Sequence, residues 1–64
     1  MKITKGKYIT ILTDNGGVEG TVTGSDGTVV KLENGVMYIG GNQKSFKQAH
    51  VLLKKIIAWT ERDG

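Results

Sequence analysis

Basic residues are concentrated in the last third of this 64-residue chain, and aromatic residues lie near them. Five of the nine basic residues follow residue 43, namely Lys44, Lys47, Lys54, Lys55 and Arg62. Nucleic-acid phosphates bind to such side chains when they share a surface, and bases stack on aromatic rings. Lys44, Lys54 and Lys55, with Tyr38 and Phe46, are therefore the candidate nucleic-acid-binding residues. Two alternatives are open: Lys54-Lys55 forms only a solvated turn, and Trp59 fills the core, as a large ring among isoleucine and leucine residues usually does.

Catalytic and metal-binding chemistry lacks the residues that it needs. The chain has no cysteine and a single histidine, His50, which rules out thiolate metal sites and leaves a zinc ion few ligands. No serine and acidic residue form an identifiable set with His50. Gly40-Gly41-Asn42 is glycine-rich but lacks the Gly-Lys-Ser/Thr ending of a phosphate-binding P-loop. We therefore expect a non-enzymatic protein without a metal or cofactor.

The overall charge and hydropathy are those of a soluble protein. The net charge of +3 permits contact with nucleic acid, although it is also ordinary for a soluble domain. No apolar run approaches the ~20 residues of a membrane-spanning helix. The basic start is not followed by the apolar core of a signal peptide. The sequence predicts a cytoplasmic protein that does not contact a membrane.

Turn signals separate short runs with β-strand composition, and together they predict one all-β domain over residues 1–64. The turn signals are Asp14-Asn15-Gly16-Gly17, Ser25-Asp26-Gly27 and Glu33-Asn34-Gly35. The expected strands are Tyr8–Thr13, 18–24, 28–32 and 36–39. Glycines at 20 and 24 in the second strand favour the sharp curvature of a small barrel. Residues before Tyr8 are expected to form an extended lead-in with solvated lysines.

Residues after the polar Gly40–Ser45 loop carry two competing patterns. Phe46, Ala49, Leu53 and Ile57 fall on one helical face, whereas β-branched and aromatic residues over 51–60 favour a strand. A single helical turn near residues 46–50, followed by a strand over 51–60, satisfies both patterns. We also expect a homo-oligomer, because a domain this small without disulfides has little core of its own.

The order of these elements resembles the Sm/LSm family of small barrels. Gly20, Val22 and Asp26 match the spacing of its first motif, and Lys31-Leu32-Glu33-Asn34-Gly35 is similar to the end of that motif. The second motif has its counterpart in Val51-Leu52-Leu53, Lys54-Lys55 and the apolar run 56–59. Val30 stands where the family has an RNA-contacting asparagine, and Lys54-Lys55 replaces its Arg-Gly pair. Barrels of the KOW type are nearly as similar, through Gly6-Lys7-Tyr8 and Gly20-Thr21-Val22.

The resemblance implies a strongly bent, five-stranded antiparallel barrel that assembles into a ring. It also implies that Asp26 braces a base-binding loop and that single-stranded RNA or DNA is the partner. Two alternatives remain at this point. One is a structural or protein-interaction barrel, such as an assembly or phage-type component, without nucleic acid. The other is a KOW-like domain associated with a ribosome or polymerase.

Overall fold

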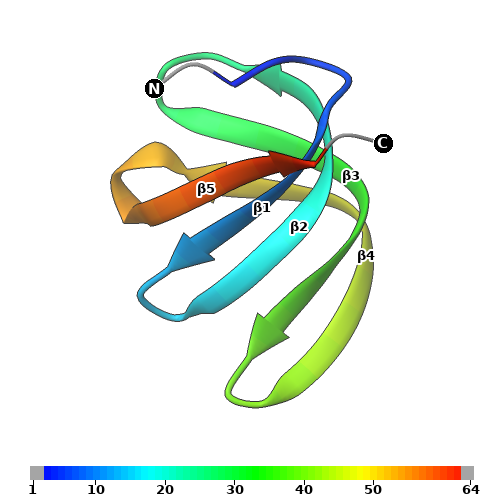
Figure 1. The fold of residues 1–64 in the computed structure, drawn as a ribbon, viewed down its shortest axis with the longest axis vertical. Coiled ribbons are helices and arrows are strands. Elements are labelled where there is room, and N and C mark those ends of the chain that lie inside the picture. Colours follow the sequence, from blue (N-terminus) through cyan, green and yellow to red (C-terminus); the bar gives the residue numbers. More distant parts are fainter. Residues whose placement is uncertain (1–2, 63–64) are drawn as a thin grey trace.

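The computed structural model describes residues 3–62, which form a single antiparallel sheet of five strands in the order β4-β3-β2-β1-β5 (Figure 1). The all-β prediction is confirmed. The elements are β1 (Tyr8–Thr13), β2 (Gly16–Ser25), β3 (Val29–Ile39), β4 (Asn42–Leu52), the 3₁₀ turn η1 (Leu53–Lys55) and β5 (Ile56–Arg62). The sheet is strongly bent but does not close, since β4 and β5 lie at its two ends. A small bent sheet is therefore correct, whereas full closure into a barrel is not observed.

The β1–β2 connection is a two-residue turn, Asp14-Asn15, and β1 has the predicted bounds. The hydroxyl of Thr13 donates to the Gly16 carbonyl oxygen at 3.0 Å and accepts the Asn15 N–H at 3.4 Å. Gly16 has a φ of 144°, and a Cβ there would overlap the carbonyl oxygen of Tyr38 on β3. This glycine lets the start of β2 lie directly against β3.

The hairpin predicted at Glu33-Asn34-Gly35 is wrong, because β3 continues through it as one strand. The register moves from Thr21↔Glu33 to Glu19↔Val36, so Gly20 of β2 lies opposite two residues, Asn34 and Gly35. Asn34 has a φ of 51°, a left-handed conformation that asparagine tolerates better than most residues. The turn-forming pair is thus used to make a β-bulge, which bends β3 and raises its twist.

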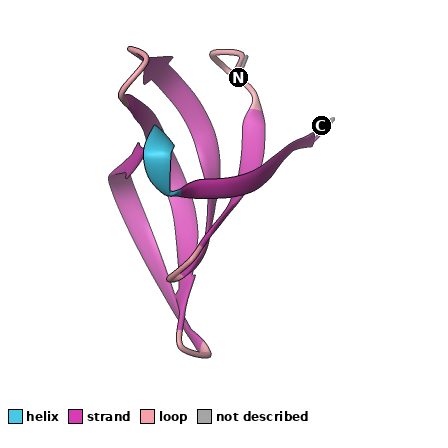
Figure 2. Ribbon diagram, turned by 90° about the vertical axis from the view of Figure 1, so that its left-hand side faces the viewer, coloured by secondary structure: helices cyan, strands magenta, loops and turns pink. Residues whose placement is uncertain are grey.

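The predicted helical turn near residues 46–50 is also wrong. These residues belong to β4, and the helical turn comes later, at Leu53–Lys55. The expected Gly40–Ser45 loop is shorter than predicted: Gly40 and Gly41, with φ of 56° and 84°, make the β3–β4 turn, and Ile39 pairs with Asn42. The single strand predicted over 51–60 is divided: Val51 and Leu52 end β4, η1 follows, and residues 56–60 belong to β5 (Figure 2).

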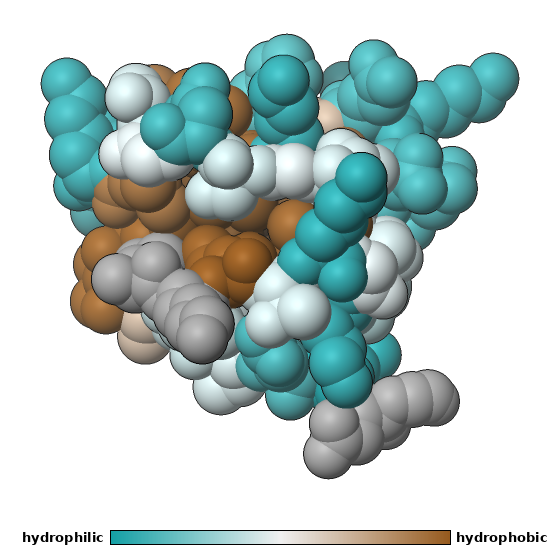
Figure 3. All heavy atoms as spheres, turned by 90° about the horizontal axis from the view of Figure 1, so that it is seen from above, coloured by the Kyte–Doolittle hydropathy of each residue, from teal (hydrophilic) through white to brown (hydrophobic). Residues whose placement is uncertain are grey.

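The core lies on the concave face of the bent sheet. Its buried residues come from the first three strands: Ile9, Ile11, Val18, Val22, Val30 and Leu32. Half-buried Phe46, Val51 and Trp59 pack against them from the two end strands. Exposed Ile39 and Leu52 line a groove beside β4, and hydrophobic surface is visible from above (Figure 3).

The lead-in before β1 is tied to β2. The Gly6 N–H donates to the Val22 carbonyl oxygen, and the Val22 N–H donates to the Lys7 carbonyl oxygen, each at 2.8 Å. Lys5 and Gly6 form a turn, and Gly6 has a φ of 89°. The extended lead-in expected from the sequence is therefore replaced by a turn held at a fixed place beside β1.

Candidate nucleic-acid interface

The β2–β3 turn is organised by the carboxylate of Asp26. Its Oδ1 accepts the backbone N–H of Thr28 and that of Val29, both at 2.9 Å. These backbone hydrogen bonds are the main reason that the pKa of Asp26 lies below its ordinary value. Gly27, with a φ of 89°, completes the turn. The carboxylate therefore acts as an internal brace and holds the Thr28 backbone in place.

The η1 turn packs directly on this brace. The Leu53 N–H donates to the Thr28 carbonyl oxygen at 2.9 Å, which joins segments 25 residues apart in the chain. A cleft of about 270 Å³ lies where they meet, lined by Gly27, Thr28, Leu52, Leu53 and Lys54. Lys54 and Lys55, both exposed, follow in the same turn. The fold thus places two cations beside a braced, glycine-containing turn.

The charge is unevenly distributed along the chain. Residues 34–60 contain four lysines and no acidic residue, so they carry +4. The remaining residues contain five basic and six acidic side chains, a net charge of −1. The +4 segment includes β4, η1 and most of β5. A polyanion is therefore attracted to this segment more than to the rest of the chain.

Tyr38 lies away from the Lys54–Lys55 turn and is engaged with β2. Its hydroxyl donates to Oε1 of Glu19 at 2.5 Å, and Oε2 of Glu19 accepts the Thr10 hydroxyl at 3.4 Å. The hydrogen bond to Glu19 is the main cause of a pKa of Tyr38 above its ordinary value. Successive strand residues point to opposite faces, and its neighbour Met37 packs against the core. Tyr38 therefore lies on the convex face and is not beside the Lys54–Lys55 turn.

Phe46 packs against the hydrophobic core. It pairs with Gly35 across β3–β4, and the end of its ring lies 2.7 Å from where a Cβ on Gly35 would be and 3.3 Å from where one on Gly20 would be. The two glycines make room for the ring on the concave face. Phe46 is half-buried against the core, so little of it is presented for base stacking. The predicted set of site residues is thus divided: Lys54 and Lys55 lie together, whereas Tyr38 and Phe46 lie on opposite faces elsewhere.

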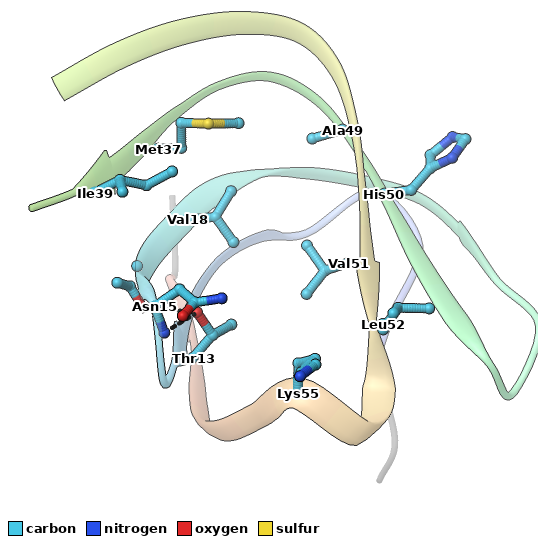
Figure 4. A pocket seen from close by; sticks show the side chains of 12 residues that line it. Thr13, Asn15, Val18, Met37, Ile39, Ala49, His50, Val51, Leu52 and Lys55 are labelled. Carbon is cyan, nitrogen blue, oxygen red and sulfur yellow. Dashed lines mark hydrogen bonds between the residues drawn. The ribbon is translucent and has the colours of Figure 1, made fainter. Parts of the chain in front are cut away.

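Lys55 and Lys44 each border a hollow beside β4. A groove of about 330 Å³ has apolar residues in its wall, including Val18, Met37 and Val51, and Lys55 lies at one end of it (Figure 4). Met37 and Ile39 also line a neighbouring hollow, which Lys44 borders on the β3–β4 hairpin. Lys44 pairs with Met37 and so shares the concave face with it. The two lysines border a mainly apolar surface beside β4.

Gly27 and Thr28 were not among the candidate residues found from the sequence. They line the cleft because Leu53 bonds to Thr28, a contact between distant segments that no local pattern reveals. The Asp-Gly-Thr order is typical of a turn capped by an aspartate side chain, so the turn itself could be predicted from the sequence.

Within residues 3–62, no three histidine or acidic side chains are grouped to hold a metal ion, and no helix has the length and hydropathy needed to cross a membrane. Comparison with known proteins gives no matching family model and no significant similarity to a curated protein.

Proposed function

We propose that this chain is a non-catalytic module that binds single-stranded nucleic acid at the cleft between the β2–β3 turn and η1. The observation that carries the proposal is the Leu53–Thr28 hydrogen bond, which holds Lys54 against the turn braced by Asp26. The resemblance to Sm/LSm barrels supports it, since that family places its basic turn and its aspartate-braced loop at the corresponding positions.

The arrangement assigns different tasks to different groups. Lys54 and Lys55 neutralise phosphates, which gives affinity without sequence preference. Gly27 presents its backbone groups and Thr28 its hydroxyl at the cleft, where the edge of an unpaired base can form hydrogen bonds. Tyr38 and Phe46 have no part in this mechanism, because the fold places them elsewhere.

A homo-oligomer is part of the proposal. Among the described strands, β4 and β5 each pair on one side only, so each offers an open edge. Ile57 on β5 is 65% exposed, and Ile39, beside the groove along β4, is 54% exposed. Pairing β5 of one copy with β4 of the next covers both edges and these apolar groups. It also repeats Lys54 and Lys55 once per copy, which raises the effective concentration of a weak site.

The test is binding of labelled oligo-U and oligo-dT at several salt concentrations. Each phosphate neutralised on a single strand contributes about −0.7 to the slope of log affinity against log salt. Replacing Lys54 and Lys55 with alanine is expected to weaken binding to all sequences and to flatten this slope, with thermal stability unchanged. Lys47→Ala, which changes an exposed lysine on β4 that does not line the cleft, is the matched control and keeps the affinity close to that of the unmodified protein. Absence of binding to both oligonucleotides at low salt refutes the proposal.

The second candidate function is that of a protein-interaction domain. The apolar groove beside the open edge of β4 favours it, because a strand added there gains backbone hydrogen bonds and apolar contacts. Oligomer formation without oligonucleotide binding is the result that selects this function over the first.

A further inference from the structure

A second cationic cleft lies at the far end of β5 from η1. It has a volume of about 440 Å³ and is lined by Lys5, Gly6, Lys7, Tyr8, Thr21 and Arg62. All three charged side chains that line it are cations, and they come from the two ends of the described chain. The nucleic-acid cleft proposed above does not use any of these residues.

The fold fixes these groups relative to one another. Tyr8 pairs with Thr21 on one side and with Arg62 on the other, so the three share the convex face of adjacent strands. The guanidinium of Arg62 lies over the Tyr8 ring, 5.3 Å from its centroid, in a cation–π contact. The backbone hydrogen bonds of Gly6 and Lys7 to Val22 hold the turn that carries Lys5. The cations are thus attached to ordered backbone and not to a loose lead-in.

The polar groups near the cleft favour an anion. Glu19 is the acidic residue whose charge acts on Tyr8; its oxygens accept the hydroxyls of Tyr38 and Thr10, and the three cations that line the cleft outnumber this one negative charge. Burial and then Glu19 raise the pKa of Tyr8, so its phenol stays neutral at physiological pH. Glu61 pairs with core residue Ile9 and so lies on the opposite face from Arg62. Arginine, with a fixed fork of donors, is the side chain best suited to phosphate oxygens.

We propose that the Lys5–Arg62 cleft is a second phosphate-binding site, in which Arg62, Lys5 and the Thr21 hydroxyl contact the phosphate oxygens. The seven residues of β5 separate it from η1 by roughly 20 Å at the usual rise of a strand. A nucleic-acid strand bound at η1 and a separate terminal phosphate are the two sources of such a group.

The test is a two-dimensional NMR titration of the whole chain with sodium phosphate at constant ionic strength, with chloride as the compensating anion. We expect saturable shifts of the Gly6, Thr21 and Arg62 amides. Arg62→Gln is expected to weaken phosphate binding about tenfold, since hydrogen bonds to charged groups are among the stronger ones. Lys5→Gln, in an exposed turn, tests the site without touching the Tyr8 packing, and Lys31→Gln is the matched control. Shifts that grow linearly, or that are the same in Arg62→Gln and Lys31→Gln, overturn the proposal.

Two further arms identify the source of the phosphate. A short oligo-dT with a 5′ phosphate that binds more tightly than the same strand without it, and loses that advantage in Arg62→Gln, indicates a terminal phosphate. Equal binding of both strands that is weakened by Arg62→Gln indicates the phosphodiester backbone. Replacing Lys54 and Lys55 with alanine leaves the inorganic phosphate titration unchanged, so failure of this cleft and failure of the η1 cleft are distinguishable.

Discussion

The hydroxyl of Tyr38 on β3 donates to Oε1 of Glu19 on β2 across 2.5 Å, and the other oxygen of Glu19 accepts the Thr10 hydroxyl on β1. One carboxylate therefore joins three neighbouring strands on the convex face. The link lies next to the bulge, because Glu19 pairs with Val36, the first residue after it.

This link predicts a loss of stability at alkaline pH. The pKa of Tyr38 lies above its ordinary value of 10.0, chiefly through its hydrogen bond to Glu19. The unfolded chain loses the phenolic proton near pH 10, while the folded chain keeps it. The contribution of the Tyr38–Glu19 hydrogen bond to stability is therefore fully present below pH 10 and declines as pH rises through the folded pKa. Glu19→Gln removes the charge and should reduce this decline. Thermal melting of both proteins between neutral pH and pH 11 measures the difference, and parallel curves contradict the prediction.

Gly35 is expected to tolerate no side chain. A Cβ at this position would overlap the Glu19 carbonyl oxygen and lie 2.7 Å from the end of the Phe46 ring. Gly35→Ala should therefore destabilise the fold by about 1–3 kcal/mol or more, as overpacking does. Gly24, also in a strand, has open space where a Cβ would lie, with no atom beyond its chain neighbours within 4 Å. Gly24→Ala is thus the matched control, and equal denaturant midpoints for the two variants would refute the packing argument.

Trp59 and Ile57 on β5 are expected to have different effects on the isolated chain and on the assembly. Trp59 pairs with Ile11 and packs on the core, so Trp59→Ala should cost about 2–3 kcal/mol of stability, less than the loss of a fully buried tryptophan.

Ile57 is largely exposed, and Ile57→Ala should leave the stability of the single chain nearly unchanged. It should instead weaken the oligomer. Light scattering is expected to show several times the 6.9 kDa of one chain, falling towards it in Ile57→Ala. A mass of 6.9 kDa for the unmodified protein at micromolar concentration rejects the assembly.

Asp26 is expected to matter for binding through the turn that it braces. Asp26→Ala removes the acceptor for the Thr28 and Val29 N–H groups, so hydrogen exchange at both amides should accelerate and oligonucleotide affinity should fall. Asp26→Asn keeps an acceptor oxygen and should preserve both the slow exchange and the oligonucleotide affinity.

Because the pKa of Asp26 is lowered in the folded chain, the contribution of its carboxylate to stability is present above pH 3.8 and is lost as pH falls through the folded pKa. The asparagine variant should lack this acid dependence.

The sequence was informative wherever the structure is decided locally. Strand β1 and the turns at Asp14 and Asp26 follow from alternation and turn chemistry within a few residues. The hairpin prediction at Asn34-Gly35 failed because the same backbone conformation occurs in a hairpin turn and in a bulge. Pairing with Gly20 on another strand decides between the two. The helical pattern over 46–57 arose because Phe46 and Ala49 both face the core, since they pair with Gly35 and Leu32 on the two sides of the bulge in β3. The cleft beside η1 was missed for a related reason, since Thr28 and Leu53 meet only after the sheet has formed.

The segregation of charge between residues 34–60 and the rest of the chain also affects how partners arrive. The four lysines of this segment lie on β4 and in η1, and an approaching polyanion is drawn towards them before contact is made. Encounters then occur preferentially with these lysines foremost. The association rate, more than the dissociation rate, should consequently fall as ionic strength rises, because screening within about 10 Å at 0.1 M salt removes this preorientation.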